Sequence, residues 1–555
     1  MIKTKLLPLA LLVATQSLLA AELPSAGSQL QQLPTIPAQQ KTIPEIRIEP
    51  SSTPAAAATD EVKITVNSLH VSGNHVYTEA TLLTVTNFKP GSVLKLSDLR
   101  AMAAKIADYY HAHGYFVAQT FLAAQNVEDG AVTISVLEGQ YGKVSINNQT
   151  NLSDEVAYKL LEGIKSGDTI NSAPLESSLL LLSDLPGVNI KSTLMPGATV
   201  GTSDLLVDIL PGPRVTGSVF ADNYGNRYTG EYRVGGTVNF NELIGHGDVL
   251  SVGGFTGIDG LYYGRVGYEA QIGRGRVGVA YSRLQYHLLR EFKDLKANGD
   301  ADVYSIFGSY PLIRSRNTNL FAHVGFDFKD FQDNIDTIPS TTNKQIKVGT
   351  LSLVGDHRDN WGGGGFSTYS GTWTHGNLDI RSADARAADR LGARTNGDYD
   401  KLSFTASRLQ NVTDIFSLYG RIQGQVGSKN LDISEKMELG GAYGVRAYPE
   451  GEAFADDGYL INLEARMLLP KWSDRIPGRM QLIGFVDTGS VTVNHNNYGT
   501  ADNHRTLSAA GVGIDWFENN NFLVRASYAF KLGNEKAISA PDKSGRLWVQ
   551  VVKYF

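Results

Sequence analysis

The sequence predicts a mostly β fold, in which a transmembrane β-barrel of about 16 antiparallel strands follows two small α+β modules. Alternating apolar and polar residues fill the chain from Pro213 to its last residue, and strand and helix patterns alternate twice before Pro211. The 555 residues include 58 Gly and 25 Tyr, which suit curved strands and membrane interfaces.

The composition excludes several classes of protein. The chain has no Cys, which excludes disulfides and thiolate metal sites. Its net charge of -6 is spread without a basic block, so no nucleic-acid partner is expected. No apolar run approaches the roughly 20 residues of a membrane-spanning helix, which excludes a helical inner-membrane protein.

The N-terminal segment has the layout of a cleaved secretory signal over residues 1–21. Lys3 and Lys5 precede the apolar run Leu6 to Ala14, and small residues follow, so the mature protein is expected to leave the cytoplasm. Residues 22–60 are rich in Pro, Gln, Ser and Thr, which predicts a linker that buries no core. A short helix over Gln29 to Gln32 is compatible with that linker.

Residues 61–139 and 140–212 repeat one plan, which predicts two tandem α+β modules of about 75 residues each. Val62, Ile64 and Val66 alternate as a strand. The other expected elements are a helix through Leu99, Met102, Ala103, Ile106 and Tyr110, strands at 117–122 and 131–137, then strands at 142–147, 188–195 and 205–210 with helices at 154–164 and 174–182.

Residues 213–555 read as one all-β domain, and most of the expected strands have about 9 to 11 residues, as tilted membrane strands do. Their number is even, which is usual for outer-membrane barrels. The expected strands are 214–222, 231–240, 249–256, 262–270, 275–284, 303–311, 318–330, 346–356, 366–376, 399–409, 415–424, 458–468, 479–487, 507–516, 522–530 and 546–555.

Loop lengths separate a membrane barrel from a soluble sandwich, because both models explain the alternation of apolar and polar residues. Connections after odd-numbered strands are long, as at 425–457, and most of those after even-numbered strands are short, as at 271–274. The chain enters the first strand from the periplasm, so the long loops are expected outside the cell. The last strand places Leu547, Val549, Val551, Lys553 and Phe555 on one face, resembling the signal that barrel-assembly machinery recognises; Lys553 departs from it and can snorkel at the rim.

Several sequence motifs match catalytic or metal-binding patterns, but structural roles explain them better than those functions do. Gly273 to Gly278 matches a dinucleotide fingerprint, but a strand follows where phosphate binding needs a helix. Gly362 to Gly365 is expected to form a periplasmic turn, and His111 and His113 lack a third ligand. Without a nucleophile elbow or a zinc-protease helix, the sequence predicts no enzyme and no cofactor.

Two segments remain unexplained by the barrel alone. Gly444 to Tyr448 lies in the longest external loop, and Phe485 to Gly489 ends the thirteenth strand, whose alternation turns Phe485 and Asp487 into the lumen. An inward-folded loop would let Arg446 pair with Asp487 away from water. The alternative is a solvated Arg446 and a carboxylate that merely lines the lumen.

With these segments in place, the chain resembles a two-partner-secretion outer-membrane transporter, the TpsB group of hemolysin secretion and activation proteins. The likeness covers nearly everything after the signal, with two POTRA domains (periplasmic α+β modules) before the barrel. The family's Val-Arg-Gly-Tyr loop tip corresponds to Val445, Arg446 and Tyr448, with Ala447 in place of Gly, and its Phe-x-Asp-x-Gly strand motif to Phe485, Asp487 and Gly489. The resemblance implies that Arg446 and Asp487 pair inside the pore and that Ser25 to Leu33 corresponds to a plug helix.

The resemblance implies a function in secretion. The expected partner is a large β-helical exoprotein (an adhesin, hemolysin or contact-dependent toxin) that crosses the periplasm unfolded and adds a strand to a POTRA edge, for which the second module is the candidate. Outer-membrane lipid and periplasmic chaperones are further expected partners, and no cofactor is implied. The alternatives are a barrel-assembly insertase of the same superfamily, a passive porin or nutrient channel, and an outer-membrane enzyme.

Overall fold

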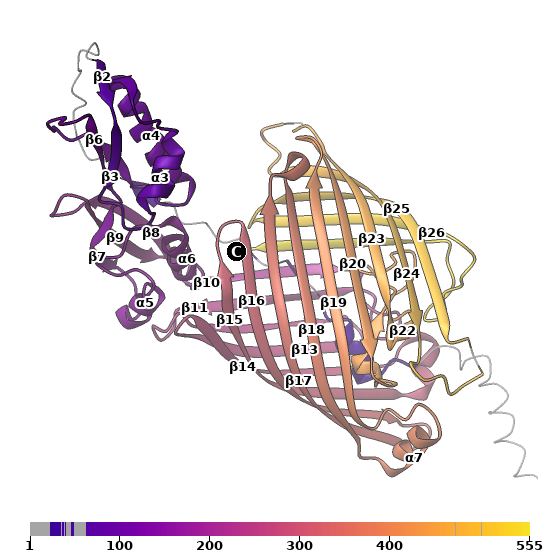
Figure 1. The fold of residues 1–555 in the computed structure, drawn as a ribbon. Helices are drawn as coiled ribbons and strands as arrows, with labels where there is room; N and C mark the ends of the chain where they lie inside the picture. The colour runs from indigo at the N-terminus through magenta and orange to yellow at the C-terminus, as the bar shows by residue number, and fades with distance from the viewer. Residues whose placement is uncertain are drawn as a thin grey trace, which may run out of the picture.

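The computed structural model describes residues 23–34, 36–37, 39, 46–48, 63–471, 473–500 and 502–555. The predicted signal at residues 1–21 therefore lies outside the described residues. Two α+β modules stand beside one end of a large barrel (Figure 1). Among the helices of the described ranges, none is both long and apolar enough to cross a membrane.

The first module packs two helices against short strands. Helix α4 begins where Asp98 accepts a hydrogen bond from the backbone of Lys95 at 2.8 Å. Its buried face, which includes Leu99, Ile106 and Tyr110, covers the sheet. The elements are β2 Lys63–Val66, β3 Ser68–Ser72, α3 Glu79–Thr86, β4 Ser92–Lys95, α4 Leu96–Ala112, β5 Gln119–Phe121 and β6 Ala131–Leu137.

The second module adds a strand that the sequence pattern did not predict. Residues Ile46–Ile48 form β1, which pairs in parallel with β8 and completes a sheet of order β1-β8-β9-β7. The predicted linker thus covers one edge of this sheet. The other elements are β7 Gln140–Asn148, α5 Asp154–Leu160, α6 Ser172–Ser183, β8 Val188–Pro196 and β9 Thr202–Pro211.

The rest of the chain forms a closed antiparallel barrel of sixteen strands, in which β10 pairs with β27 to close the wall. Every predicted barrel strand has a counterpart. The strands are β10 Val215–Asp222, β11 Arg233–Asn241, β12 Val249–Thr256, β13 Leu261–Ile272, β14 Gly275–His287, β15 Ala297–Arg314, β16 Thr318–Ile335, β17 Ser340–Asp359, β18 Gly365–Ile380, β19 Gly397–Asn411, β20 Phe416–Gly427, β23 Asp457–Leu468, β24 Arg479–Thr492, β25 His504–Glu518, β26 Phe522–Lys531 and β27 Gly545–Tyr554.

Several strands are longer than the alternation predicted. Strand β17 has 20 residues, about twice the length that crosses a membrane. Strand β24 continues to Thr492, so the Phe485 to Gly489 motif lies within the strand, and the prediction that it ends the strand was wrong. The connections contain η1 Arg290–Leu295, η2 Trp361–Gly363, α7 Ala383–Leu391, η3 Ile433–Glu435, β21 Met437–Glu438 and β22 Phe454–Ala455.

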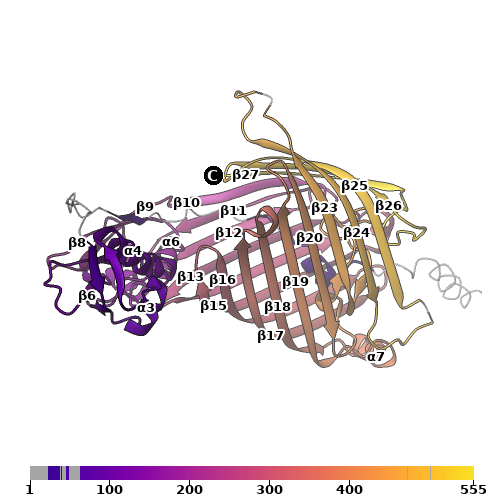
Figure 2. The ribbon, with the colours of Figure 1, turned by 45° about the horizontal axis from the view of Figure 1, so that its top comes forward.

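The second module contacts the periplasmic turns of the barrel. Arg314 forms an ion pair with Asp184 at 2.7 Å, and Arg316 forms one with Glu176 at 2.7 Å. Both acids belong to or follow helix α6, which Figures 1 and 2 show beside the barrel mouth. These contacts fix the module at the end where the chain enters the barrel.

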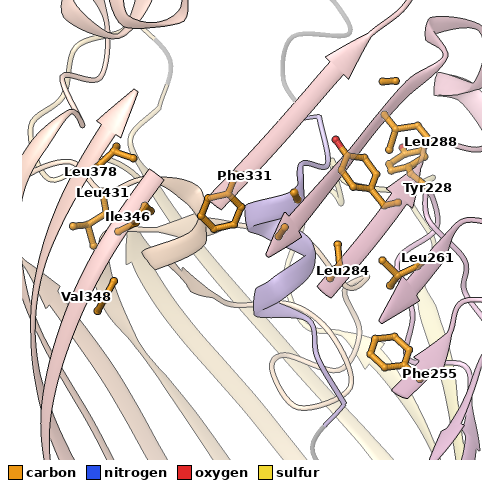
Figure 3. Close-up of a cluster of buried hydrophobic side chains, with 14 of the residues drawn as sticks. Tyr228, Phe255, Leu261, Leu284, Leu288, Phe331, Ile346, Val348, Leu378 and Leu431 are labelled. Carbon is orange, nitrogen blue, oxygen red and sulfur yellow. The ribbon is translucent and has the colours of Figure 1, made fainter. Parts of the chain in front are cut away.

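The barrel interior is not empty. Helix α2, Ala26–Gln31, lies inside it, between the labelled side chains of Phe331 and Leu284 (Figure 3). Ser25 caps this helix, because its hydroxyl accepts a hydrogen bond from the backbone of Ser28. The short helix that the linker was expected to accommodate is therefore present, beginning three residues earlier than Gln29.

Candidate functional site in the barrel lumen

The strand side of the site lies on the inner face of β24. Val486 faces outward and is 46% exposed, whereas its neighbours Phe485 and Asp487 are buried in the lumen, as the alternation predicted. A Cβ at Gly489 would lie 2.4 Å from the Leu439 side chain. Glycine at this position therefore lets the long loop pack directly on the strand.

The loop side of the site is residues 428–456, called loop L6 here, which folds back into the lumen. Strands β21 and β22 pair Met437 with Ala455 and narrow the loop into a hairpin. Val445, Ala447 and Tyr448 at its tip are each 0% exposed. Ala447 is absent from the described residues with positive φ, so alanine fits this tip without backbone strain.

Arg446 and Asp487 meet in this lumen, as predicted. The guanidinium donates from Nη2 to Oδ1 and from Nε to Oδ2, both at 2.8 Å, and the backbone N–H of Arg446 donates to Oδ2 at 3.2 Å. The guanidinium carbon lies 3.5 Å from the ring centroid of Phe485. Because Asp487 is 0% exposed, this bidentate pair is shielded from water.

Three further residues complete the site, and sequence reasoning did not assign them to it. Glu464 of β23 accepts from Nη1 of Arg446 at 2.9 Å, and Asn462 donates to Asp487 at 2.8 Å. Trp548 of β27 donates from its indole N–H to the carbonyl of Arg446 at 2.6 Å. The inward alternation of Asn462 and Glu464 was a usable signal, but no sequence pattern linked Trp548 to the loop.

The descending limb of L6 is held by buried ion pairs on the opposite wall. Lys344 contacts Asp432 at 2.8 Å, and Glu435 bridges Lys329 at 2.7 Å and Lys401 at 2.9 Å. Burial alone would raise the pKa of Glu435, but the two ammonium groups overcome it and lower the pKa to about 2. Glu435 therefore stays charged and paired.

The returning limb of L6 is held by strand β25 and by the loop between β26 and β27. Glu452 is fully buried, accepts from Arg505 at 2.7 Å, and accepts from the backbone of Ile538 and Ser539. Tyr448 donates its hydroxyl hydrogen to the carbonyl of Glu535 at 3.0 Å. Loop L6 is thus held on three sides.

Helix α2 is held by side chains of the lumen at both ends. The Ala26 N–H donates to Asp333 at 2.8 Å, and Thr229 donates to Gln29 at 2.6 Å. The carbonyl of Gln32 accepts from Arg233 at 2.8 Å, and Gln31 donates to Ser434 of L6. The plug helix and the loop therefore contact one another directly.

Two carboxyl groups of L6 lie at the end of α2. Burial, together with the neighbouring Glu450, raises the pKa of Glu438. Burial also raises the pKa of Glu450 to about 7. Gly451 donates to Glu438, which also interacts with Gln32. Both carboxyl groups therefore hold their protons to a higher pH than an exposed glutamate does.

The remaining motifs take no part in the site. His111 contacts the carbonyl of Ala118 at 2.8 Å, and His113 contacts that of Tyr109 at 2.7 Å, both within the first module. Gly273 lies in the turn between β13 and β14, and Gly362 in the turn between β17 and β18. Across the described ranges, no group of three or more candidate ligands could hold a metal ion.

A sixteen-stranded barrel whose lumen holds a helix and an arginine-tipped loop, with α+β modules at one mouth, defines an outer-membrane transporter of polypeptides. A model of the haemolysin secretion/activation protein family ShlB/FhaC/HecB matches residues 201–516, and a model of the ShlB-type POTRA domain matches residues 64–139. Because the first match spans more than half of the chain, the protein belongs to this family of TpsB transporters.

Curated relatives agree with this assignment. The heme/hemopexin transporter protein HuxB of Haemophilus influenzae is 27% identical over 558 residues, which cover 98% of this chain and 97% of the relative. The outer membrane transporter CdiB of Dickeya dadantii is 25% identical over 429 residues, covering 76% of this chain and 74% of the relative. The protein is therefore an outer-membrane transporter of exoproteins, with its POTRA modules in the periplasm.

The fold has a close counterpart among solved structures. CdiB from Escherichia coli superposes with a TM-score of 0.71 and covers 91% of this chain and 93% of that chain, at 20% identity. At this identity the likeness concerns the fold alone. It supports the arrangement of barrel and periplasmic modules.

Proposed function

We propose that the protein binds an unfolded exoprotein in the periplasm through its POTRA modules and passes it through the barrel to the cell surface. One observation carries the proposal: the lumen holds two elements, α2 and L6, that lie outside the hydrogen-bonded wall. Both are fastened by side-chain contacts, so they can rearrange without opening the barrel wall.

Capture begins at the second POTRA module in this proposal. An extended client can add its backbone hydrogen bonds to a free strand edge. Here β1 occupies the β8 edge through Ile46, Arg47 and Ile48, each paired with one residue of β8. The client therefore replaces a strand of the transporter's own linker, and this exchange releases Ile46–Ile48, which follow α2 in the chain, from the second module.

In this proposal the binding of Arg446 to Asp487 and Phe485 holds the closed state. Val445 and Tyr448 share the apolar cluster of Phe485, and Leu439 of the same loop packs on Gly489. A buried bidentate pair is more demanding to separate than an exposed one, because both charges must be paired or hydrated when it opens. Nucleotide is absent from the periplasm, so folding of the client outside the cell supplies the direction of transport. Outer-membrane lipid surrounds the barrel, and periplasmic chaperones deliver the client.

The client is proposed to resemble those of the heme/hemopexin transporter relatives. HuxB matches 98% of this chain, whereas CdiB of Dickeya dadantii matches 76%. A contact-dependent toxin is the second candidate client.

The test uses a candidate exoprotein client, sought first among the genes beside this one, and assays it in the medium and on the cell surface. Secretion should be lost without the transporter or without residues 63–212, and should fall in the Arg446→Ala variant at normal barrel levels. The Arg408→Ala variant is a matched control, because Arg408 pairs with Asp359 at 2.8 Å and touches none of the lumen site. Unchanged secretion in the deletion strain, together with failure of other barrels to assemble, would instead establish an insertase.

A further inference from the structure

The inner face of β17, β18 and β19 carries a patch of hydroxyl groups, called the hydroxyl wall here. Two adjacent rows of the register form it: Ser352, Thr372 and Ser403 lie side by side, and Val354, Ser370 and Thr405 form the next row. The hydroxyls of Ser352 and Thr372 are hydrogen-bonded at 2.9 Å. Both rows lack any charged side chain.

The alternation of the strands shows that this wall faces the lumen. Trp373 and Leu402, the neighbours of Thr372 and Ser403 on the outer face, are 51% and 56% exposed. Lys401 has the same orientation as Ser403 and contacts Glu435 of L6 inside the barrel. The wall therefore belongs to the interior of the pore.

Open space separates the hydroxyl wall from the plug. A cavity of about 400 Å³ touches Ser403 and Thr405 of the wall, Gln31 at the end of α2, and Leu33 beyond it. Its lining also includes charged side chains of β19, β20 and L6: Lys401, Arg421, Lys436, Glu438 and Glu450. Val354 is 39% exposed even though it points inward. The lumen is therefore already open along this wall in the closed state.

The opposite wall of the lumen carries charged side chains. The inner faces of β23 to β26 carry the paired charges of Arg466, Asp487 and Arg525. The tip of L6 covers this charged wall and binds to it through Arg446. The hydroxyl wall is thus an uncharged patch between the charged wall that binds the tip of L6 and the lysines of β16, β17 and β19 that bind its descending limb.

We infer that the unfolded client, in an extended conformation, runs along the hydroxyl wall, on the side of the lumen away from the Arg446–Asp487 pair. This inference rests on the proposed function. A hydroxyl both donates and accepts hydrogen bonds, so it can satisfy either kind of backbone group that passes. Neutral groups bind any one segment weakly and do not hold charged side chains of the client, so the chain can slide.

This path does not pass through the Arg446–Asp487 pair. Because the cavity reaches from Ser403 and Thr405 to L6 and the end of α2, a client can advance there once α2 and the adjoining limb of L6 move. The pair at Asp487 need not break for the first segment to enter. The hydroxyl wall therefore separates the surface that conducts the client from the surface that holds the loop.

Site-specific photocrosslinking tests the inference in intact cells. The probe is the N-terminal part of the exoprotein client used in the secretion test, fused to a stably folded domain so that it stalls in the barrel. A photoreactive residue at Thr372 or Ser403 should crosslink to the stalled chain at least about tenfold more than one at Trp373 or Leu402, because only the former face the lumen. A further position, Ser527, reports the opposite wall.

Equal crosslinking at Ser527 and Thr372, or crosslinking confined to Ser527, would overturn the inference. Secretion of the unfused exoprotein is measured in the same strains. If secretion is normal and depends on the transporter, but no crosslinks form at the hydroxyl wall, the proposed path is wrong and the transporter function still holds. Secretion that does not depend on the transporter would overturn both.

A charge placed on the wall provides a second test. The double variant Thr372→Lys, Ser403→Lys should slow secretion about tenfold, as a barrier higher by about 1.4 kcal/mol would. The isosteric variant Thr372→Val should secrete close to normally if weak binding is what matters. Barrel folding is checked by heat-modifiable migration of the full-length protein. A folded double-lysine variant that secretes at the normal rate would contradict the inference.

Discussion

Arg446 is shared between two carboxylates, Asp487 at 2.8 Å and Glu464 at 2.9 Å, inside a site closed to water. Glu464 also pairs with Arg466 at 2.7 Å, so loss of one acid redistributes the remaining charges. Removal of one partner from a buried pair typically costs about 3 to 5 kcal/mol, because the other charge remains buried and uncompensated. Asp487 also accepts a hydrogen bond from the side-chain amide of Asn462. It is therefore the more important of the two acids for holding Arg446.

The Asp487→Ala variant is therefore expected to release L6. A loss of about 3 kcal/mol would shift the docking equilibrium of the loop more than about 100-fold. Single-channel conductance of the purified protein in planar bilayers should show frequent large openings. The Asp515→Ala variant is the matched control, since Asp515 is a buried lumen acid paired with Arg525 at 3.0 Å and not with the loop. Identical conductance in the two variants would contradict this assignment.

Protonation is expected to tighten the contact between L6 and α2. The pKa of Glu450, raised to about 7 from an ordinary value of 4.5, means that the docked state binds a proton that the undocked state releases. The resulting stabilisation is complete below about pH 4.5 and is lost as the pH rises through about 7. Glu438 shifts in the same direction. The charges that face this pair are those of Asp222, Arg233 and Glu452.

Spontaneous openings should therefore become more frequent between pH 5 and pH 8, a window given by this pKa shift. The Glu450→Gln variant carries no titrating group at this position, so its opening frequency should change less over the same range. Bilayer conductance at fixed salt measures both proteins. A steeper pH dependence in the variant would show that another group controls the loop.

At the scale of single residues, the sequence predicted the principal pair but not its surroundings. The alternation of β24 places Asp487 in the lumen, and the loop motif indicates Arg446. Trp548 lies 102 positions from Arg446 and contacts only its backbone carbonyl, so side-chain chemistry gives no signal for it. The lysines that hold Asp432 and Glu435 come from three different strands, which only the closed barrel brings together.

At the scale of elements, the sequence pattern did not predict the short strand β1, because its order comes from tertiary pairing. Strand β1 has 3 residues within a Pro-rich segment, and its pairing with β8 supplies order that local composition does not. Strands such as β17 exceed their predicted ends because polar residues continue the ladder beyond the membrane, where apolar alternation stops. Tertiary pairing thus decides where these elements end.

Strand β1 also gives a prediction for client binding. The Arg47→Pro variant removes a backbone N–H and is incompatible with regular pairing at this position, so the β8 edge should become free. Unfolded exoprotein should then bind the full-length transporter about fivefold more tightly, if β1 contributes about 1 kcal/mol to the edge. Fluorescence anisotropy of the labelled exoprotein measures this, with Arg47→Lys as control. Unchanged affinity would place the docking edge elsewhere.

At the scale of the whole molecule, the sequence predicted all sixteen barrel strands and the α+β character of both modules. Alternation over membrane-spanning segments is strong because lipid and lumen impose opposite polarity on the two faces. The sequence could not predict how the modules meet the barrel, which depends on Arg314 and Arg316 reaching Asp184 and Glu176 across the mouth.

Whether the protein alone moves an unfolded chain across a bilayer is the most direct test of the account. The measurement is protease protection of a denatured exoprotein added to vesicles that contain only the full-length transporter with its POTRA modules outside. Protected exoprotein should accumulate inside without nucleotide, and vesicles with the Arg446→Ala variant should protect less. Vesicles in which the folded transporter protects no exoprotein would contradict the claim that this barrel is the conduit.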